Sequence, residues 1–195
     1  MNEQIKKIVD KIHELEEEMR SILYEQQSEF SYKIAGKRVK FEENIRQAHK
    51  KLKMSWFYWF ITINPKHLLS APFIYGLIIP LLVFDLGVSI YQAICFRLYG
   101  IAQVRRSDYI VFDHQHLAYL NLFEKSHCFY CSYATGLINY GREIASRTEQ
   151  YWCPIKHAHK MLDTHHRYAD FLDYGYAESY QDNLVKIRKT LQKEK

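Results

Sequence analysis

Helical and strand periods alternate over the first quarter of the chain. Residues 1–29 place apolar side chains at alternating spacings of three and four, which predicts an amphipathic helix with a narrow stripe of the coiled-coil kind. The stripe consists of Ile5, Ile8, Ile12, Leu15, Met19 and Ile22. Such a stripe either packs on the rest of its own chain or forms the seam of a dimer. A homo-oligomer formed through this N-terminal helix is therefore one expected partner.

The period then changes twice before residue 54. Within residues 30–53, apolar and polar positions first alternate on both sides of Gly36, which predicts a short β-hairpin turned at that glycine. A helical pattern returns from Glu42 and ends in a basic stretch with Lys50, Lys51 and Lys53. Lysines followed at once by Trp56, Tyr58 and Trp59 are typical of a membrane interface, so residues 54–63 are expected to lie there.

The strongest signal is the apolar run over residues 68–96, in which Asp85 is the single charged residue. A helix needs about 20 apolar residues to cross a bilayer, so residues 54–98 are interpreted as a membrane-interacting segment with the lipid bilayer as partner. One geometry is a single span kinked at Pro80. The other is a re-entrant hairpin that turns near Pro80, which the basic residues on both flanks favour because positive flanks prefer the cytoplasm.

Asp85 is expensive in lipid unless it is paired, protonated or turned toward protein. A hydrogen bond to Ser89, a tyrosine or a lysine is the ordinary interpretation, and an ion or proton pathway is the sharper one. Residues 99–175 are expected to form a helical domain that bears cysteines and histidines, with helices over 132–150 and from Pro154 toward Gly175. Residues 176–195 predict a basic C-terminal helix. The fold class is thus mainly α: a membrane-associated helical protein with a small β-hairpin and a C-terminal helical bundle.

Composition narrows the class of protein further. The 27 Lys and Arg residues exceed the 22 acidic residues by five, a mild excess that suits an anionic membrane surface, and no nucleic-acid partner is expected. Only 7 glycines and 4 prolines agree with long helices. Since no P-loop, dinucleotide fingerprint, nucleophile elbow or zincin motif is found in the sequence, whether the protein is an enzyme is left open.

Three of the four cysteines fall within 26 residues. Cys128 and Cys131 form a C-x-x-C pair, and Cys153 stands one helical turn before His157. Thiolate and imidazole are good zinc ligands, so these four residues predict a Cys3His site, with an iron–sulfur cluster as the alternative cofactor. Gly136 and Gly141 weaken the predicted helix over 132–150. A straight helix there would hold Cys128 and Cys153 too far apart, unless it broke at one of these glycines or the site were shared by two copies. A redox dithiol with Cys128 as nucleophile and a set of buried thiols are the other interpretations.

A second group of possible metal ligands surrounds the cysteines. His159 and Asp163, like His166 and Asp170, are four residues apart and would share a helix face, whereas ordinary surface or core histidines are the plainer interpretation. Glu143 and Glu149 are candidate hydrogen-bond acceptors behind such a site. The complete second group is His114, His116, His159, Asp163, His166 and Asp170.

Three consecutive motifs, "YIVFDHQHLAYLN", "CFYCSYATGLINYG" and "REIASRTEQYWCPIKHA", resemble a group of uncharacterised bacterial membrane-associated proteins. The resemblance covers roughly residues 100–160, and no activity is attached to the group. It implies a bacterial, membrane-associated setting. Together with the basic flanks of the apolar segment, it predicts location at the bacterial inner membrane with the soluble part in the cytoplasm.

These observations give three hypotheses from different classes. The first is a membrane-anchored protein with a cytoplasmic Cys3His metal-binding domain whose reaction is unknown. The second is a membrane-associated oligomeric scaffold or assembly protein without a catalytic metal. The third is a membrane thiol oxidoreductase that uses the C-x-x-C pair.

Overall fold

The computed structural model describes residues 3–29, 32–35, 38–55, 58 and 61–194. Of the described residues 71% are helical, which confirms the prediction of a mainly α protein. The chain divides into two compact units. The N-terminal unit comprises residues 1–61 and 113–126, and the helical unit comprises residues 62–112 and 127–195.

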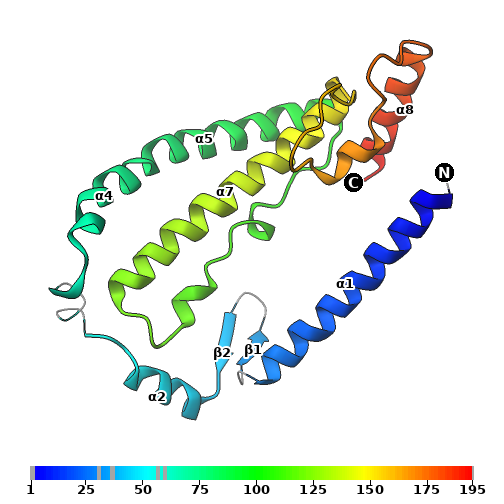
Figure 1. The fold of residues 1–195 in the computed structure, drawn as a ribbon. Helices are drawn as coiled ribbons and strands as arrows, with labels where there is room; N and C mark the ends of the chain where they lie inside the picture. Colours follow the sequence, from blue (N-terminus) through cyan, green and yellow to red (C-terminus); the bar gives the residue numbers. More distant parts are fainter. Residues whose placement is uncertain (1–2, 30–31, 36–37, 56–57, 59–60, 195) are drawn as a thin grey trace. The chain divides into compact units, whose positions relative to one another are not determined.

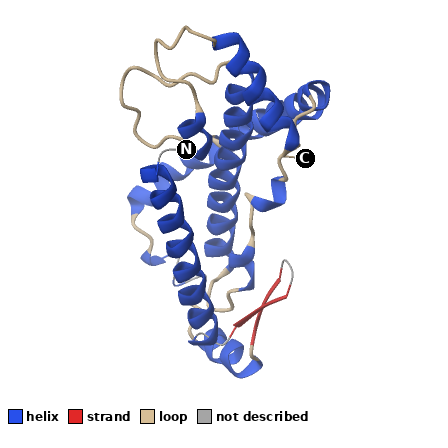
Figure 2. Cartoon of the chain, turned by 90° about the vertical axis from the view of Figure 1, so that its right-hand side faces the viewer, coloured by secondary structure: helices blue, strands red, loops and turns tan. Residues whose placement is uncertain are grey.

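The N-terminal unit combines helices with one hairpin (Figures 1 and 2). It contains α1 (Glu3–Glu29), β1 (Tyr32–Ala35), β2 (Arg38–Phe41), α2 (Glu43–Lys51) and a 3-10 turn over Asp113–His116. The strands pair antiparallel with Tyr32 opposite Phe41 and Ala35 opposite Arg38, which confirms the hairpin; its predicted turn at Gly36 lies outside the described residues. In α1, Ile12, Leu15, Met19 and Ile22 are each about half exposed, with values from 49% to 56%. These four residues of the predicted stripe are therefore open to a further partner.

A single long helix begins the helical unit. It is built from α4 (Pro65–Gly76), α5 (Ile78–Tyr91), a π-helical turn over Gln92–Phe96 and α6 (Arg97–Tyr99). Asn64 caps its start by accepting a hydrogen bond from the backbone N–H of Lys66. The 35 residues Pro65–Tyr99 are long and apolar enough to cross a membrane by length and composition. Four residues of the interfacial segment predicted over 54–63, among them Trp56 and Trp59, lie outside the described residues, so its helical extent is not assigned.

The chain does not turn back at Pro80, so the expectation of a hairpin turn there is wrong. Pro80 is the third residue of α5, close to the helix start, where a missing N–H costs little. The backbone N–H of Leu81 donates to the carbonyl of Leu77 at 3.2 Å, which carries the hydrogen-bond ladder past the proline. Among the described residues near Pro80, the only interruption is one turn residue, Leu77, between α4 and α5.

The second long helix, α7 (Leu122–Trp152), lies beside α5 and runs in the same direction (Figure 1). Parallel neighbours need a return connection, which is residues 100–121 with 3-10 turns over Arg106–Asp108 and Asp113–His116. Part of this return segment lies against Gly136: a Cβ there would stand 2.6 Å from the Tyr109 carbonyl oxygen and 2.9 Å from the Ile110 Cα. The glycine that was expected to weaken α7 instead admits neighbouring backbone.

The predicted helix from Pro154 toward Gly175 is wrong. α7 extends to Trp152, and Pro154 ends it because proline has no N–H to continue the ladder. The chain then forms a parallel bridge between Ile155 and Leu172, with a 3-10 turn over His166–Asp170. The last helix, α8 (Tyr180–Lys193), confirms the C-terminal prediction. The core of this unit contains Phe96, Ile101, Leu137, Tyr140, Ile144 and Leu191.

Candidate functional site

Buried polar groups gather where α5, the return segment and α7 meet. Asp85 is 7% exposed and lies on the inner face of the apolar helix. Its Oδ1 accepts from Arg106 at 2.7 Å and its Oδ2 accepts from the Tyr133 hydroxyl at 2.8 Å. Ser89 donates a longer bond of 3.4 Å to Oδ1. Asp85 is thus fully paired, by Ser89 and a tyrosine as the ordinary interpretation anticipated, and by an arginine that the sequence did not indicate.

Two turns further along the helix from Asp85, Gln92 forms a second polar contact. Its side-chain Oε1 accepts from the Val104 backbone N–H at 3.0 Å, and its Nε2 donates to the Val104 carbonyl at 3.4 Å and to the Tyr140 hydroxyl. Gln92 is the first residue of the π-helical turn. The side-chain amide of Gln92 thus satisfies both backbone polar groups of Val104, which has no neighbouring strand to pair with among the described residues.

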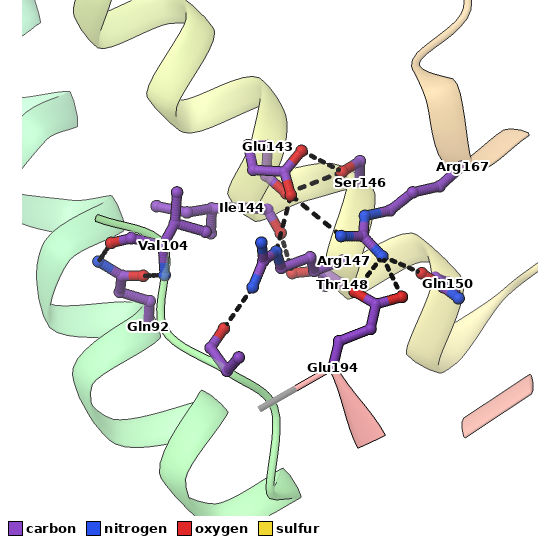
Figure 3. A network of polar contacts seen from close by, with 11 residues as sticks. Gln92, Val104, Glu143, Ile144, Ser146, Arg147, Thr148, Gln150, Arg167 and Glu194 are labelled. Carbon is purple, nitrogen blue, oxygen red and sulfur yellow. Dashed lines mark hydrogen bonds and ion pairs between the residues drawn. The ribbon is translucent and has the colours of Figure 1, made fainter. Parts of the chain in front are cut away.

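A third cluster is centred on Glu143, in the middle of α7 (Figure 3). Glu143 Oε1 accepts from Arg147 at 2.7 Å and from Arg167 at 3.2 Å. Arg167, in the 3-10 turn after α7, also donates to Gln150 at 2.8 Å and to Glu194 at 2.9 Å. Arg147 donates to the Ala102 carbonyl at 2.7 Å. These contacts join α7 to the return segment, the loop after α7 and the C-terminus.

The charge state of Glu143 follows from this arrangement. Burial raises the pKa of the carboxyl, but the hydrogen bond from Arg147 and the charges of Arg167 and Arg147 together outweigh burial and hold the pKa below its usual value. Burial, followed by the charge of Glu143, raises the pKa of nearby Tyr109. At neutral pH the cluster therefore holds an ionised carboxylate between two guanidinium groups.

A cavity of about 340 Å³ opens beside this cluster. Its lining includes Tyr109, Arg142, Glu143, His165 and His166. His165 Nε2 lies 2.9 Å from Glu149 Oε2, and Arg142 pairs with Asp163 at 3.2 Å. Glu143 and Glu149 both act as hydrogen-bond acceptors, as the sequence indicated, but their partners are arginines and His165 rather than metal ligands.

The four residues of the predicted Cys3His site do not meet within one chain. Cys128 and Cys131 lie within α7, and Cys153 follows its last residue. The 25 residues between Cys128 and Cys153 correspond to roughly 37 Å of helix, because α7 does not break at Gly136 or Gly141. His157 instead stacks on the Tyr168 ring, 6.4 Å between centroids. These residues do not fit one metal ion within a single chain; a site shared between two copies stays a prediction.

The second predicted group is also dispersed. His114 and His116 lie in the N-terminal unit, where they are exposed. Asp163 and His166 line the cavity beside Glu143, whereas His159 and Asp170 are exposed elsewhere. Among the described residues, no three His, Cys, Asp or Glu side chains gather closely enough to hold a metal ion.

Sequence reasoning missed Gln92, Arg106, Tyr133, Arg147 and Arg167, which form most of the buried polar contacts. One signal was available for Arg147, because Glu143 and Arg147 are four residues apart on a predicted helix. The others join segments far apart in sequence, and no periodicity marks them. Comparison with known proteins adds no candidate role, since no family model, curated protein or solved structure matches the chain.

Proposed function

We propose that the protein is a membrane-bound helical scaffold that attaches to one leaflet through the helix Pro65–Tyr99 and associates with other copies through α1. One observation carries this proposal: within its apolar run, the long helix turns the polar side chains of Asp85 and Gln92 toward the protein and large apolar side chains outward. Asp85 and Gln92 are buried, whereas Leu69, Phe73, Val83 and Leu98 are between 67% and 78% exposed. A helix at the surface of a water-soluble protein has the opposite arrangement.

The return segment favours a helix that lies in the plane of the membrane over one that crosses it. Its polar contacts are made with Asp85 and Gln92, which stand inside the apolar run. At the same level Arg105 and Asp108 are exposed, and the backbone is largely irregular. Irregular backbone and exposed charges do not occur in contact with the hydrocarbon core. An in-plane helix lets the outer apolar face enter the acyl chains while the return segment stays in water.

The exposed stripe of α1 supports the scaffold part of the proposal. Ile12, Leu15, Met19 and Ile22 recur at spacings of three and four and are about half exposed. A stripe of this width suits the seam of a two-stranded coiled coil. Attachment to a leaflet would concentrate copies in two dimensions and favour their pairing through α1.

Vesicle flotation tests the attachment. We expect the full-length protein to float with phospholipid vesicles without detergent, and Val83→Asp to reduce the bound fraction about tenfold or more, because a carboxylate would enter the acyl region. Thr135→Asp is the matched control, since Thr135 is exposed on α7. If Val83→Asp and Thr135→Asp float as well as the parent, the outward face of the long helix does not contact lipid.

A further inference from the structure

A cavity of about 740 Å³ in the N-terminal unit is lined by cationic side chains. They come from β2, from α2 and the residues after it, from the 3-10 turn region and from the start of α7. The cationic residues are Lys40, Arg46, Lys50, Lys53 and Lys125, and the neutral or cationic His116 joins them. No aspartate or glutamate is among the described residues that line this basic pocket.

The positive charge of the basic pocket is scarcely neutralised by the protein. Lys40, Lys50 and Lys53 form no ion pair with any carboxylate in the part of the chain that the structure describes. Arg46 pairs with Glu43 at 3.5 Å, but both side chains are more than half exposed, so water screens the pair. Like charges around one cavity repel one another, and an anion bound among them removes that repulsion.

The pocket has a defined shape. Lys125 Nζ donates to the Gln115 carbonyl at 2.7 Å, and Gln115 Nε2 donates to the Lys125 carbonyl at 3.2 Å. His49 packs edge-on against both Phe41 and Tyr119, with 5.4 Å between ring centroids in each case. These contacts fix β2, α2 and the segment before α7 relative to one another within the unit.

Apolar side chains form the remaining wall of the pocket. They are Val39, Phe41, Ala118 and Leu120. A site that combines ammonium and guanidinium donors with an apolar wall suits a phosphate group carried on an organic body. Lysine binds phosphate as a point charge and arginine offers a planar fork, so this set of donors tolerates several phosphate geometries.

We infer that the basic pocket is a binding site for a phosphate-bearing anion. The shared chemistry is a phosphomonoester or phosphodiester with an apolar part, and it has two possible sources. One is the headgroup of an anionic phospholipid, which the membrane attachment proposed above would supply; the other is a soluble phosphorylated compound. The inference depends on the pocket and not on that attachment.

Titration calorimetry of the full-length protein in nonionic detergent tests this site. The probes are inorganic pyrophosphate, dioctanoyl phosphatidylglycerol and, as the lipid without net charge, dioctanoyl phosphatidylcholine. Binding of phosphatidylglycerol alone assigns a lipid headgroup, binding of pyrophosphate alone assigns a soluble ligand, and binding of both assigns the phosphate itself. Phosphatidylcholine is expected to bind far more weakly than either.

Three variants make the test specific: two remove the same number of charges, inside or outside the pocket, and one keeps the charge. K40Q/K50Q/K53Q is expected to weaken binding about tenfold or more, because three charge-assisted contacts are lost. K40R/K50R/K53R keeps the charge and is expected to retain binding. K11Q/K51Q/K160Q removes the same charge from exposed residues outside the pocket lining and is expected to bind like the parent. Circular dichroism checks that each variant is folded.

Two results would overturn the inference. The first is that neither pyrophosphate nor phosphatidylglycerol binds the parent protein at millimolar concentration. The second is that K11Q/K51Q/K160Q weakens binding as much as K40Q/K50Q/K53Q, since the protein would then bind anions through net charge alone. Neither result bears on vesicle flotation of the Val83→Asp variant, so a failure of this inference is distinguishable from a failure of the proposed attachment.

Discussion

Glu143 holds its place in the fold through the buried Arg167 and the partly buried Arg147. Arg147 and Arg167 both donate to its Oε1, and the side chains of Glu143 and Arg167 are each 8% exposed. Removing one partner of a buried ion pair leaves the other charge uncompensated, which typically costs about 3–5 kcal/mol. The role of Glu143 is structural, because the cluster around it joins four segments of the helical unit.

Substitution of Glu143 by Gln therefore has a large expected effect. We expect Glu143→Gln to lower the free energy of unfolding by about 3 kcal/mol, because Arg147 would lose its anionic partner and Arg167 would keep only the more exposed Glu194. Denaturant unfolding followed by circular dichroism measures the change. Glu178→Gln, at an exposed position, is the control and is expected to be neutral. A change below about 1 kcal/mol for Glu143→Gln would place the three-residue cluster among ordinary surface pairs.

The same carboxylate predicts the direction of a pH effect. Its pKa in the folded protein lies below its usual value, so folding favours the ionised form. The stabilisation is complete above the pKa of the unfolded chain and is lost as pH falls through the lower pKa of the folded state. We expect the thermal midpoint of the parent to fall more steeply on acidification than that of Glu143→Gln. Parallel curves for the two proteins would show that another group dominates the acid transition.

Gly136 in α7 and Gly87 in α5 form a matched pair, one closely packed and one open. A Cβ on Gly136 would meet backbone atoms of Tyr109 and Ile110 below 3.0 Å, whereas a Cβ on Gly87 would meet nothing within 4 Å. We expect Gly136→Ala to destabilise the fold by about 1–3 kcal/mol through overpacking. Gly87→Ala is expected to be neutral or to stabilise by about 0.5–1 kcal/mol, since alanine favours helix. Thermal unfolding of both variants checks the contrast.

At the scale of elements, the local pattern of apolar and polar residues predicted those helices and strands that depend on local sequence alone. The stripe of α1, the alternation around Gly36 and the charged pattern of α8 each identified the correct element, because each is set by residues within a few turns. The roles of Gly136 and Pro154 were predicted wrongly because they depend on neighbouring residues. Gly136 makes room for the return segment, and Pro154 stands at the end of α7, which extends to Trp152. The buried contacts of Arg106 and Arg167 could not be predicted, since they require the three-dimensional arrangement.

Whether the predicted Cys3His site can form within one chain depends on the continuity of α7. With the other cysteines replaced by serine, spin labels on Cys128 and Cys153 should lie about 37 Å apart in pulsed electron resonance, before allowance for the label arms. Such a separation leaves a shared metal possible only between two copies. A narrow distribution near 10–15 Å would show a broken helix and restore a metal site within one chain.

At the scale of the whole molecule, two features explain why a protein with so apolar a helix needs a buried polar interior. In the proposed attachment, the outward face of Pro65–Tyr99 would contribute no specificity, because lipid accepts any apolar surface. The inward contacts of Asp85 and Gln92 hold the helix in one orientation against α7 and the return segment. In the proposed attachment, these polar groups would define which side of the helix meets lipid.

Association through α1 belongs to the same scale. We expect the detergent-solubilised protein to be a dimer or larger, and Leu15→Lys with Met19→Lys to shift it to monomer, because two charges would enter the seam. Light scattering with refractive index detection measures the protein mass. Glu14→Lys with Glu18→Lys is the control for charge outside the stripe. A parent protein that is monomeric throughout the accessible concentration range would remove the scaffold part of the proposal.

The in-plane position of the long helix is tested most directly by labelling from the two sides of a sealed membrane. Single cysteines at Lys66 and Arg105, in a background without native cysteines, are exposed to a membrane-impermeant maleimide in vesicles of known orientation. Lys66 stands at the start of the helix, and Arg105 follows its end, between two residues that contact Asp85 and Gln92 in its second half. We expect both positions to react from the same side, with Arg105 as reactive as a soluble thiol. Protection of Arg105 from the reagent, or its labelling only from the side opposite Lys66, would show that the helix crosses the bilayer.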